Sequence, residues 1–546
     1  MSNKMNEPNY EKNLLERFEE SFSAAFARPV FRDYTSGEEA TYGLTGYRIM
    51  QLHEQFRANG IEEGDKIALA GADSLRWCTA FMAIITYGAV AVPLMPNFPA
   101  EDMAHLINHS EAKALFADKV RRGMLSNYPL EGVRLRFNLE DLSLREGDSE
   151  VWRVANELPT DFTPGDIRFS RRSNDELMLL NYTSGTSGMS KGVMLTGANL
   201  SGNVVYAVED RKMFRSGDRL LCFLPLAHTY SCSFNLLSPV ASSELVVILG
   251  QMPTPRVLAK AFQDVKPNLI LTVPLIIEKI YKLALQPKLA KRYMRVLMAI
   301  PIVKNVVYAN IRKRLSDFFG GEFREVVAGG AALAPEIDTF FHRIGFPLTV
   351  GYGMTECGPL ICYSPCRIRK PHSCGRPLPK MQVRIVAERK NEIEVRGLNV
   401  CQGYYKQPEA TKELFTEDGW MRTGDLGYLD KQNNLFIVGR SKNMILSASG
   451  ENIYPEEIES KVASLPYIED CLVVQRKSGL VALIVLNEAA YQADGLNQEQ
   501  ARQRLSDERV ALNHRLPAYA PISAFVFRDG PFEKTPKQSI KRYLCG

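Results

Sequence analysis

The most informative stretch of this chain is rich in glycine and hydroxyl side chains, and it reads Tyr182-Thr183-Ser184-Gly185-Thr186-Ser187-Gly188-Met189-Ser190-Lys191-Gly192. Glycines allow backbone N–H groups to turn toward an anion, and the hydroxyl groups add short donors. Lys191 adds a mobile positive charge. These properties together predict a loop that wraps a polyphosphate. The loop differs from a Walker A loop, because Ser190 precedes the lysine where that motif has glycine.

Apolar runs flank this loop on both sides. Residues 177–180 precede it, and residues 193–195 follow it. A flexible surface linker is also rich in glycine and serine, but it would lack two flanking strands. The order strand, glycine loop, strand therefore predicts a phosphate clamp built on a sheet.

Apolar strands alternate with helical stretches along the rest of the N-terminal region. The pattern predicts strands over residues 66–70, 90–94, 220–224 and 245–249, and helices over residues 10–28 and 75–87. Such alternation is typical of an α/β architecture with parallel sheets.

Two long stretches, residues 77–100 and 221–243, contain no charged side chain. A transmembrane helix needs about 20 continuous apolar residues. Prolines and a glycine interrupt the first stretch, and His228, Asn235 and Pro239 interrupt the second. Both stretches are therefore expected in the core of the protein.

The overall composition excludes several classes of protein. The net charge of +5 is small for 546 residues, which argues against a dedicated nucleic-acid binder. The acidic, non-apolar start of the chain does not resemble a signal peptide. Ten cysteines without paired spacing suit a reducing, cytoplasmic location. Cys357, Cys362, Cys366 and Cys374 lie closer together, but their spacing matches no common metal-site pattern, so we favour ordinary loop and core cysteines over a metal site.

Residues 287–319 form a strongly basic segment, with eight lysines and arginines and a single acid, Asp317. One interpretation is a solvated helical face. The other is contact with an anionic membrane or with the phosphates of a cofactor. On sequence grounds we favour the solvated face, with peripheral membrane contact as the alternative.

The character of the chain changes near residues 439–442. About a hundred residues follow, which is enough for a small domain. They predict helices over residues 456–464 and 498–513 and strands over residues 468–475 and 480–486. We therefore predict two domains, over residues 1–439 and 440–546.

Further motifs follow the glycine-rich loop along the chain. They read Leu224-Pro225-Leu226-Ala227-His228, Gly329-Gly330-Ala331, Gly351-Tyr352-Gly353-Met354-Thr355-Glu356, Thr423-Gly424-Asp425, Gly439-Arg440-Ser441-Lys442 and Gly450-Glu451-Asn452-Ile453-Tyr454-Pro455. Together with the loop they resemble the motif series of the adenylate-forming enzymes, which include acyl-CoA synthetases, firefly luciferase and the adenylation domains of peptide synthetases. One such motif would be weak support, but the series in this order is very specific and covers most of the chain.

The resemblance implies a two-step reaction and a fold to match it. A carboxylate attacks the α-phosphorus of ATP and expels pyrophosphate, and the acyl group then passes to a thiol. The expected fold is α/β, with a large N-terminal domain of several subdomains for nucleotide and acyl binding and a small, mobile α+β domain after it. In this family the small domain rotates between the two steps, about a hinge that corresponds to Lys442. The protein is expected to neutralise charge and hold groups in line.

The same resemblance gives each motif residue a role. The phosphates of ATP are expected to contact the loop residues Thr183, Ser184, Gly185, Thr186, Ser187, Gly188 and Lys191. Glu356 corresponds to the Mg²⁺ ligand, and Thr355 corresponds to a phosphate contact. Asp425 would accept the ribose hydroxyl groups, and Arg440 would reach the ribose or the α-phosphate. Tyr352 would stack on adenine, and the remaining nucleotide contacts would come from Gly330, Ala331, Gly353 and Gly450.

Each of these residues also has an ordinary structural interpretation. An acid beside glycines, such as Glu356 or Asp425, is common in surface turns, and a lone histidine in an apolar run is usually a core residue. The family context favours the functional interpretation, in which His228 lines the site near the acyl carboxylate and the phosphates.

One position departs from the family pattern. The family closes on a motif similar to Lys-Thr-x-x-x-Lys-Ile-x-Arg, whose second lysine orients the carboxylate and the α-phosphate during adenylation. This chain instead reads Lys534-Thr535-Pro536-Lys537-Gln538-Ser539-Ile540-Lys541-Arg542, so Ser539 occupies the lysine position. Lys537 or Lys541 could substitute for the missing lysine, adenylation could be severely slowed, or the change could have been engineered to trap one state. A nucleotide- and acyl-binding protein that has lost efficient adenylation is therefore the alternative to an active enzyme.

The substrate class follows from weaker signals. Residues 272–281 and 319–327 resemble segments of long-chain fatty acyl-CoA synthetases, and no Asp lies within residues 224–243, where peptide synthetases usually bind an amine. The small residues 329–332 would leave room for an alkyl chain, although apolar pockets discriminate chain length weakly, by roughly 1–3 kcal/mol per methylene. We expect a fatty or other apolar acid, ATP with Mg²⁺, and coenzyme A as substrates, with a free acyl carrier protein as the competing acceptor.

Overall fold

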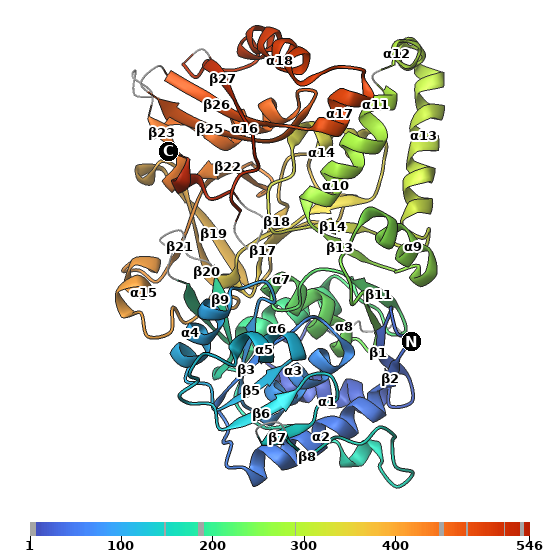
Figure 1. Cartoon of the computed structure of the whole chain (residues 1–546), viewed down its shortest axis with the longest axis vertical. Helices are drawn as coiled ribbons and strands as arrows, with labels where there is room; N and C mark the ends of the chain where they lie inside the picture. Colours follow the sequence, from blue (N-terminus) through green and yellow to red (C-terminus); the bar gives the residue numbers. More distant parts are fainter. Residues whose placement is uncertain are drawn as a thin grey trace.

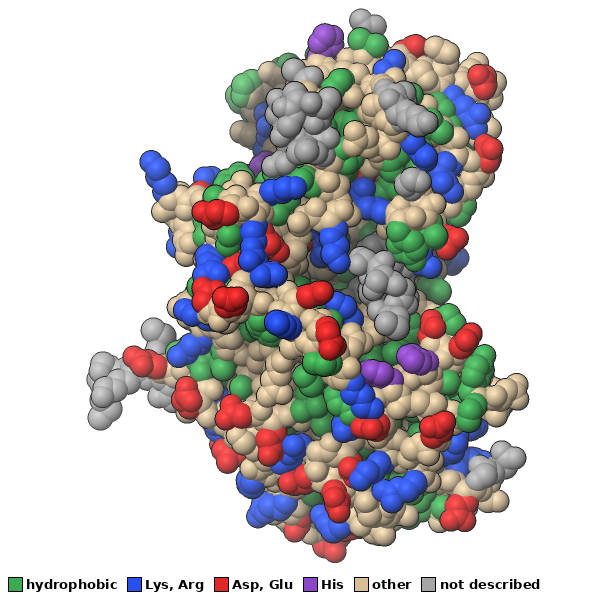
Figure 2. Space-filling view, turned by 90° about the vertical axis from the view of Figure 1, so that its left-hand side faces the viewer, with side chains coloured by type: hydrophobic (Ala, Val, Ile, Leu, Met, Phe, Trp, Pro, Cys, Tyr) green, Lys and Arg blue, Asp and Glu red, His purple; other side chains and the backbone are tan. Residues whose placement is uncertain are grey.

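The computed structural model describes residues 7–146, 149–183, 190–289, 291–446, 452–476, 479–517, 519–534 and 540–545 of the chain. Figure 1 shows an elongated molecule whose lower part contains the two large sheets of the N-terminal half, and whose upper part contains the C-terminal helices and strands. The expected α/β architecture is confirmed. Acidic and basic side chains are intermixed over the face in Figure 2, in keeping with the small net charge.

The largest sheet has eight strands in the order β10-β9-β4-β3-β5-β6-β7-β8. Its centre, from β9 to β6, is parallel, whereas β10, β7 and β8 are antiparallel to their neighbours. The strands span Lys66–Ala70 (β3), Val90–Leu94 (β4), Ala114–Ala117 (β5), Leu135–Asn138 (β6), Leu144–Glu146 (β7), Ser149–Trp152 (β8), Leu177–Thr183 (β9) and Lys191–Thr196 (β10). The glycine-rich loop therefore joins two antiparallel neighbours, β9 and β10, as its flanking apolar runs predicted.

Helix α3 (Leu75–Tyr87) connects β3 to β4 with the bounds that the sequence predicted. The Ser74 hydroxyl accepts from the Trp77 N–H at the helix start, and Gly88 ends the helix at a φ of 90°, which a residue with a Cβ adopts with difficulty. The charge-free stretch 77–100 thus forms buried helix and strand, as predicted. Within the described residues, no helix is both long and apolar enough to cross a lipid bilayer.

A second sheet lies beside the first and has the order β11-β12-β1-β2. Its strands span Pro29–Asp33 (β1), Glu39–Thr41 (β2), Arg219–Cys222 (β11) and Leu245–Ile248 (β12), which confirms the two predicted apolar strands. Helix α1 (Leu14–Ala24) is shorter than the predicted range 10–28, because the Asn13 side chain caps it by accepting from the Leu15 N–H.

Smaller sheets contain the motifs that follow. One is parallel, with β13 (Ile270–Thr272), β14 (Val326–Ala328) and β15 (Leu348–Val350). Three others are antiparallel. The first has β16 (Tyr352–Gly353), β17 (Leu360–Tyr363) and β18 (Arg376–Pro377), and the second has β19 (Met381–Val386), β20 (Glu392–Gly397), β21 (Met421–Leu429) and β22 (Leu435–Arg440). The third has β23 (Ile445–Leu446) and β24 (Asn452–Ile453).

The remaining helices of this region cover the sheets or extend from them. They span Tyr42–Ala58 (α2), Ala100–Ser110 (α4), Lys119–Leu125 (α5), Gly197–Val205 (α6), Thr229–Ser231 (α7), Ser238–Ala241 (α8), Pro255–Val265 (α9), Pro274–Ile280 (α10), Gln286–Leu289 (α11), Arg292–Ala299 (α12), Pro301–Phe318 (α13), Pro335–Arg343 (α14) and Pro408–Leu414 (α15). Wider turns at Cys232–Leu237 (η3) and Tyr281–Leu285 (η4) join α7 to α8 and α10 to α11.

The C-terminal segment has a hydrophobic core of its own, formed around Ile458, Val462, Leu505 and Leu512. The predicted elements are present as α16 (Pro455–Ala463), β25 (Ile468–Arg476), β26 (Gly479–Leu486) and α18 (Gln498–Asn513). The sequence analysis missed α17 (Glu488–Ala493) and β27 (Ile522–Arg528), which pairs in parallel with β26.

All ten cysteines are free, and eight of them are buried. Burial raises the pKa of the less buried Cys366 and Cys374 to about 12, so their thiols stay protonated and unreactive at neutral pH. In the part of the chain that the structure describes, no group of three or more His, Cys, Asp or Glu side chains is arranged to hold a metal ion.

Candidate active site

A cleft of about 2360 Å³ lies between the N-terminal region and the C-terminal helix α16. Each predicted site residue within the described ranges lines it: Thr183, Lys191, His228, Gly330, Ala331, Tyr352, Gly353, Thr355, Glu356, Asp425, Arg440 and Lys442. The other predicted residues, Ser184, Gly185, Thr186, Ser187, Gly188, Gly450, Lys537 and Ser539, lie outside the described residues. Thr183 and Lys442, about 260 positions apart in the sequence, therefore line one cavity.

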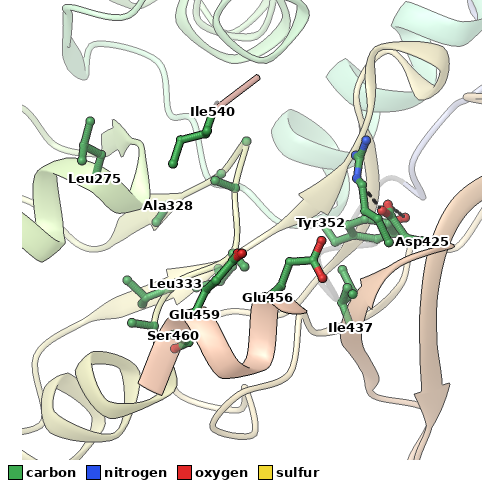
Figure 3. Close-up of a pocket in the computed structure, with 18 of the residues that line it drawn as sticks. Leu275, Ala328, Leu333, Tyr352, Asp425, Ile437, Glu456, Glu459, Ser460 and Ile540 are labelled. Atoms are coloured by element: carbon green, nitrogen blue, oxygen red, sulfur yellow. Dashed lines mark hydrogen bonds and ion pairs between the residues drawn. The ribbon is translucent and has the colours of Figure 1, made fainter. Parts of the chain in front are cut away.

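The polar side of the cleft is organised around Asp425, which lies on β21 opposite Arg440 on β22. The Arg440 Nε is 2.9 Å from Asp425 Oδ1, and the Tyr352 hydroxyl donates to Asp425 Oδ2 at 2.7 Å. Figure 3 shows Tyr352 and Asp425 side by side, with an ion pair of Asp425 drawn as a dashed line. The arrangement joins three motifs that the sequence places far apart.

The three side chains differ in exposure and charge. Asp425 is only 5% exposed, and burial raises its pKa, whereas Arg440 and the Tyr352 hydroxyl act in the opposite direction. The attraction of Asp425 raises the pKa of Arg440, whose side chain remains 59% exposed. Asp425 can therefore accept hydrogen bonds from a ligand's hydroxyl groups, while the guanidinium stays open to an anion.

A second constellation forms around Glu356, which is 8% exposed. The Tyr404 hydroxyl donates to Glu356 Oε1 at 2.8 Å, and the Lys191 ammonium lies 4.5 Å from the centroid of the same ring. Lys191 is the first residue of β10, directly opposite Thr183 on β9. Tyr404 thus links the cation of the glycine-rich loop to the buried carboxylate.

The sequence analysis missed Tyr404. It reaches the site because residues 402–405 bond to β10: the Met194 N–H donates to the Gly403 carbonyl at 3.0 Å, and the Tyr405 N–H donates to the Gly192 carbonyl at 2.8 Å. This pairing joins segments about 200 residues apart, and no local pattern announces it. Burial, followed by the charge of Glu356, raises the pKa of Tyr404, so the phenol stays protonated and remains a donor.

His228 and Thr355 lie close to this constellation. His228 caps the short helix α7, since its Nδ1 accepts from the Tyr230 N–H at 3.2 Å. This bond fixes the neutral tautomer with the proton on Nε2. The Thr229 hydroxyl donates to Thr355 Oγ1 at 3.4 Å, which connects α7 to the turn that contains Glu356. Both side chains belong to the same wall of the cleft.

Tyr404→Phe tests the bond between Tyr404 and Glu356. For the acyl-adenylate formation that the motif series implies, we expect the variant to lower kcat/KM about tenfold, because a hydrogen bond to a charged group contributes about 1.5 kcal/mol. Exchange of labelled pyrophosphate into ATP measures this step. The matched control is Tyr405→Phe, whose hydroxyl donates to Glu111 at 2.6 Å away from the cleft. Equal losses in the two variants would contradict a specific role for Tyr404.

Part of the cleft lining is apolar. It includes Phe234, Leu271, Leu275, Val327, Ala328, Leu333 and Val350. Figure 3 places Leu275, Ala328 and Leu333 at one end of the view and Tyr352 and Asp425 at the other. The Tyr230 ring closes over Gly329, where an added Cβ would lie 3.1 Å from a ring carbon. The cleft can therefore receive a molecule with an apolar tail and a polar, anionic end.

The C-terminal segment contributes charged groups that the sequence analysis did not single out. Glu456 and Glu459 of α16 line the cleft, and Figure 3 shows both on the helix face turned toward it. Arg542 forms an ion pair with Glu459. Burial raises the pKa of Glu459 to about 7, and Arg542 opposes this rise. The sequence predicts this helix, but which groups its acidic side chains meet depends on how the two parts of the chain come together.

Two family models match the chain. The model of the AMP-binding enzyme matches residues 18–405, and that of the AMP-binding enzyme C-terminal domain matches residues 442–545. The first match alone covers more than half of the chain.

Curated relatives match most of the chain. The long-chain-fatty-acid–CoA ligase FadD15 of Mycobacterium bovis is 30% identical over 459 residues, which cover 79% of this chain and 75% of the relative. The long-chain-fatty-acid–[acyl-carrier-protein] ligase AEE15 of Arabidopsis thaliana is 26% identical, covering 85% of this chain and 74% of the relative. The 4-coumarate–CoA ligase 4 of Arabidopsis thaliana is 27% identical, covering 82% and 76%.

Solved structures support the same fold. The ATP-bound structure of MatB from Rhodopseudomonas palustris superimposes with a TM-score of 0.76 and 22% identity, covering 98% of each chain. The large α/β region and the smaller C-terminal region therefore have the architecture that the motif series implied. The chain belongs to the AMP-binding enzyme family, and the curated relatives that it matches are ligases of carboxylic acids with thiols.

Proposed function

We propose that this enzyme ligates a fatty or other apolar carboxylic acid to coenzyme A through an acyl adenylate, using ATP and releasing AMP and pyrophosphate. The observation that supports this proposal most strongly is the single cleft, which combines Asp425, Arg440, Lys191 and Glu356 with an apolar wall. The charged residues suit a nucleoside triphosphate and the apolar wall suits an apolar acid, and the reaction needs both substrates in one cleft.

In the proposed first step, the protein brings two anions together. Lys191 and Thr183, which line the cleft, would contact the departing phosphates, and Arg440 would offer its exposed guanidinium to the α-phosphate or the ribose. Asp425 would accept the ribose hydroxyl groups, and Tyr352, with the backbone at Gly330 and Ala331, would contact adenine. The contacts of Asp425 with Arg440 and Tyr352 hold these three side chains in place, which reduces the cost of ordering them during the reaction.

Glu356 fits the role of a Mg²⁺ ligand. Its carboxylate is buried, its Oε1 is oriented by the Tyr404 hydroxyl, and oxygen ligands are those that Mg²⁺ prefers. Thr355, the preceding residue, would supply a hydroxyl near the same phosphates. When bound, the ion would neutralise charge on the phosphates of ATP. His228, which also lines the cleft, would lie near the acyl carboxylate.

Product analysis tests the proposed reaction. Purified protein with Mg-ATP, coenzyme A and a panel of aliphatic and aromatic acids should release AMP and pyrophosphate in equal amounts and form an acyl thioester. Release of ADP, or nucleotide binding without turnover of any acid, would contradict the proposal. Substitution of acyl carrier protein for coenzyme A tests the other acceptor, which the similarity to the Arabidopsis carrier-protein ligase supports.

A binding protein without efficient adenylation is the second candidate, because Ser539 replaces the family's lysine. Calorimetric binding of ATP without pyrophosphate exchange for any carboxylate would favour it. The free thiols of the cysteines support a reducing, cytoplasmic location for either candidate.

We also propose that the chain forms two domains, residues 1–439 and 440–546, that rotate about a hinge near Lys442. The separate hydrophobic core of the C-terminal segment supports this division. Lys442→Pro fixes φ near −65° and should restrict the rotation. We expect thioester formation from preformed acyl adenylate to fall more than adenylate formation does, as separate assays of the two steps would measure. Equal loss in both steps would mean that the hinge lies elsewhere.

A further inference from the structure

Helices α12 and α13 form an arm that has no core of its own. The arm, residues 291–310, lies at the right-hand edge of the upper part of the molecule in Figure 1, where α12 crosses the end of α13. None of the side chains described within it is buried, and the buried residue of α13, Leu315, comes after it. A helix as short as α12, with eight residues, is marginal in water and is normally stabilised by packing an apolar face.

The arm nevertheless exposes large apolar side chains. Their exposed fractions are 57% for Tyr293, 62% for Val296, 36% for Leu297, 48% for Ile300, 79% for Ile302 and 55% for Val306. Single exposed apolar residues are ordinary on protein surfaces, but a contiguous set marks a surface that contacts something. At helical spacing, positions 293, 296, 297 and 300 share one face of α12, and positions 302 and 306 share one face of α13; these two faces are called the apolar edge below.

Basic residues lie before and after this apolar edge in the sequence. Residues 287–319 contain eight basic residues and one acid, an excess that is larger than the net charge of +5 of the whole chain. The rest of the protein is therefore slightly acidic. Lys288, Lys291, Arg312 and Arg314 are exposed. Among the residues that the structure describes, the single ion pair of this segment joins Lys313 to Asp317.

The arm continues directly into the wall of the cleft. Leu275 on α10 and Leu283 on η4 line the cleft and are 41% and 59% exposed. Helix α11 then joins η4 to the arm. An apolar molecule that moves from the arm toward the cleft would therefore pass the exposed side chains of Leu283 and Leu275.

We propose that the arm docks on an anionic lipid bilayer, with its apolar edge inserted among the headgroups and its lysines and arginines against the lipid phosphates. Amphipathic helices with basic flanks bind such surfaces through these two contributions. A bilayer offers both an apolar layer and anionic phosphates, which match the apolar edge and the basic residues of the arm. The docking would deliver the apolar acid to the cleft, and this consequence alone rests on the proposed function.

Vesicle binding tests the docking without any catalysis. The full-length protein should co-sediment with vesicles that contain phosphatidylglycerol and much less with pure phosphatidylcholine, and salt should weaken the binding. Each basic residue near an anionic surface changes the partition coefficient about fivefold. Lys288→Gln with Lys291→Gln should therefore lower it about 25-fold. Val296→Asp with Ile302→Asp should abolish the binding, because both side chains lose their apolar contact.

Matched controls come from exposed residues elsewhere. Lys412→Gln with Lys431→Gln removes the same charge, and Val510→Asp with Val151→Asp places the same carboxylates at valines that are 58% and 50% exposed. Neither pair should change vesicle binding. The proposal would be overturned if the arm pairs and the control pairs change vesicle binding equally. It would also be overturned if the protein does not bind anionic vesicles or shows no preference for them. If the protein does not bind anionic vesicles but binds acyl carrier protein saturably through the arm, the partner is a protein and the proposal is overturned.

The two proposals can fail separately. Vesicle binding that the arm variants abolish, in a protein that turns over no acid, would support the docking and contradict the proposed reaction. Turnover of an acid supplied in free solution, without vesicle binding, would contradict the docking alone. The arm variants should retain turnover of an acid in free solution, which also shows that they fold.

Discussion

Ser539→Lys is expected to raise the rate of acyl-adenylate formation by about 10²–10³ and to leave thioester formation from preformed acyl adenylate nearly unchanged. A lysine ammonium that faces both a carboxylate and an α-phosphate reduces their mutual repulsion as they approach. Serine has no charge and a shorter side chain. Pyrophosphate exchange measures the first step, and single-turnover transfer from acyl adenylate to coenzyme A measures the second.

The neighbouring lysines provide the control for this result. Lys534 and Ile540, which lie before and after Ser539 in the sequence, form an antiparallel backbone β-bridge, and both line the cleft. Lys534 is engaged with Asp470 at 2.7 Å, whereas the Lys541 ammonium lies 3.6 Å from Glu533 and also lines the cleft. If Lys537 or Lys541 already supplies the charge, Ser539→Lys will change little, and Lys537→Ala or Lys541→Ala will slow adenylation instead. A rise in the second step alone would contradict the assignment of this position to adenylation.

Glu356→Gln is expected to lower the rate of acyl-adenylate formation by about 10²–10³, the loss that follows removal of one well-placed electrostatic group. The amide oxygen of glutamine can still accept from the Tyr404 hydroxyl, so the fold around β10 should persist while the charge that would hold Mg²⁺ is lost. Titration of Mg²⁺ at fixed ATP should show a higher concentration at half-maximal rate. A normal rate with unchanged Mg²⁺ dependence would exclude Glu356 from the metal site.

Glu111→Gln is the matched control for this variant. Glu111 accepts from Tyr405 at 2.6 Å, as Glu356 accepts from the adjacent Tyr404, but it is exposed and lies outside the cleft. Combination of Glu356→Gln with Tyr404→Phe should cost less than the two single losses multiplied together, because both changes act on one contact. Fully additive losses would mean that the carboxylate and the phenol act independently.

The α/β fold and most of the described site could be predicted from the sequence, because their signals are local. Helix α3 begins and ends where predicted, since Ser74 and Gly88 satisfy its ends through neighbours in the chain. The strand at 90–94 is apolar throughout, and the strand at 66–70 is apolar after Lys66, as buried parallel strands require. The motif residues that line the cleft were found because each motif is contiguous, and the family match of residues 18–405 and 442–545 agrees with that series.

Tertiary structure alone decided which of these residues touch. Tyr404 meets Glu356 because a segment near residue 403 pairs with β10, and Asp425 meets Tyr352 because β21 and β16 converge on one wall of the cleft. Strand β27 was missed because its pairing with β26 crosses about 40 residues, and such long-range pairing leaves little local pattern. The basic segment was visible in the sequence, but the exposure of Val296 and Ile302 was not, since an apolar helical face looks the same whether it packs on a core or faces solvent.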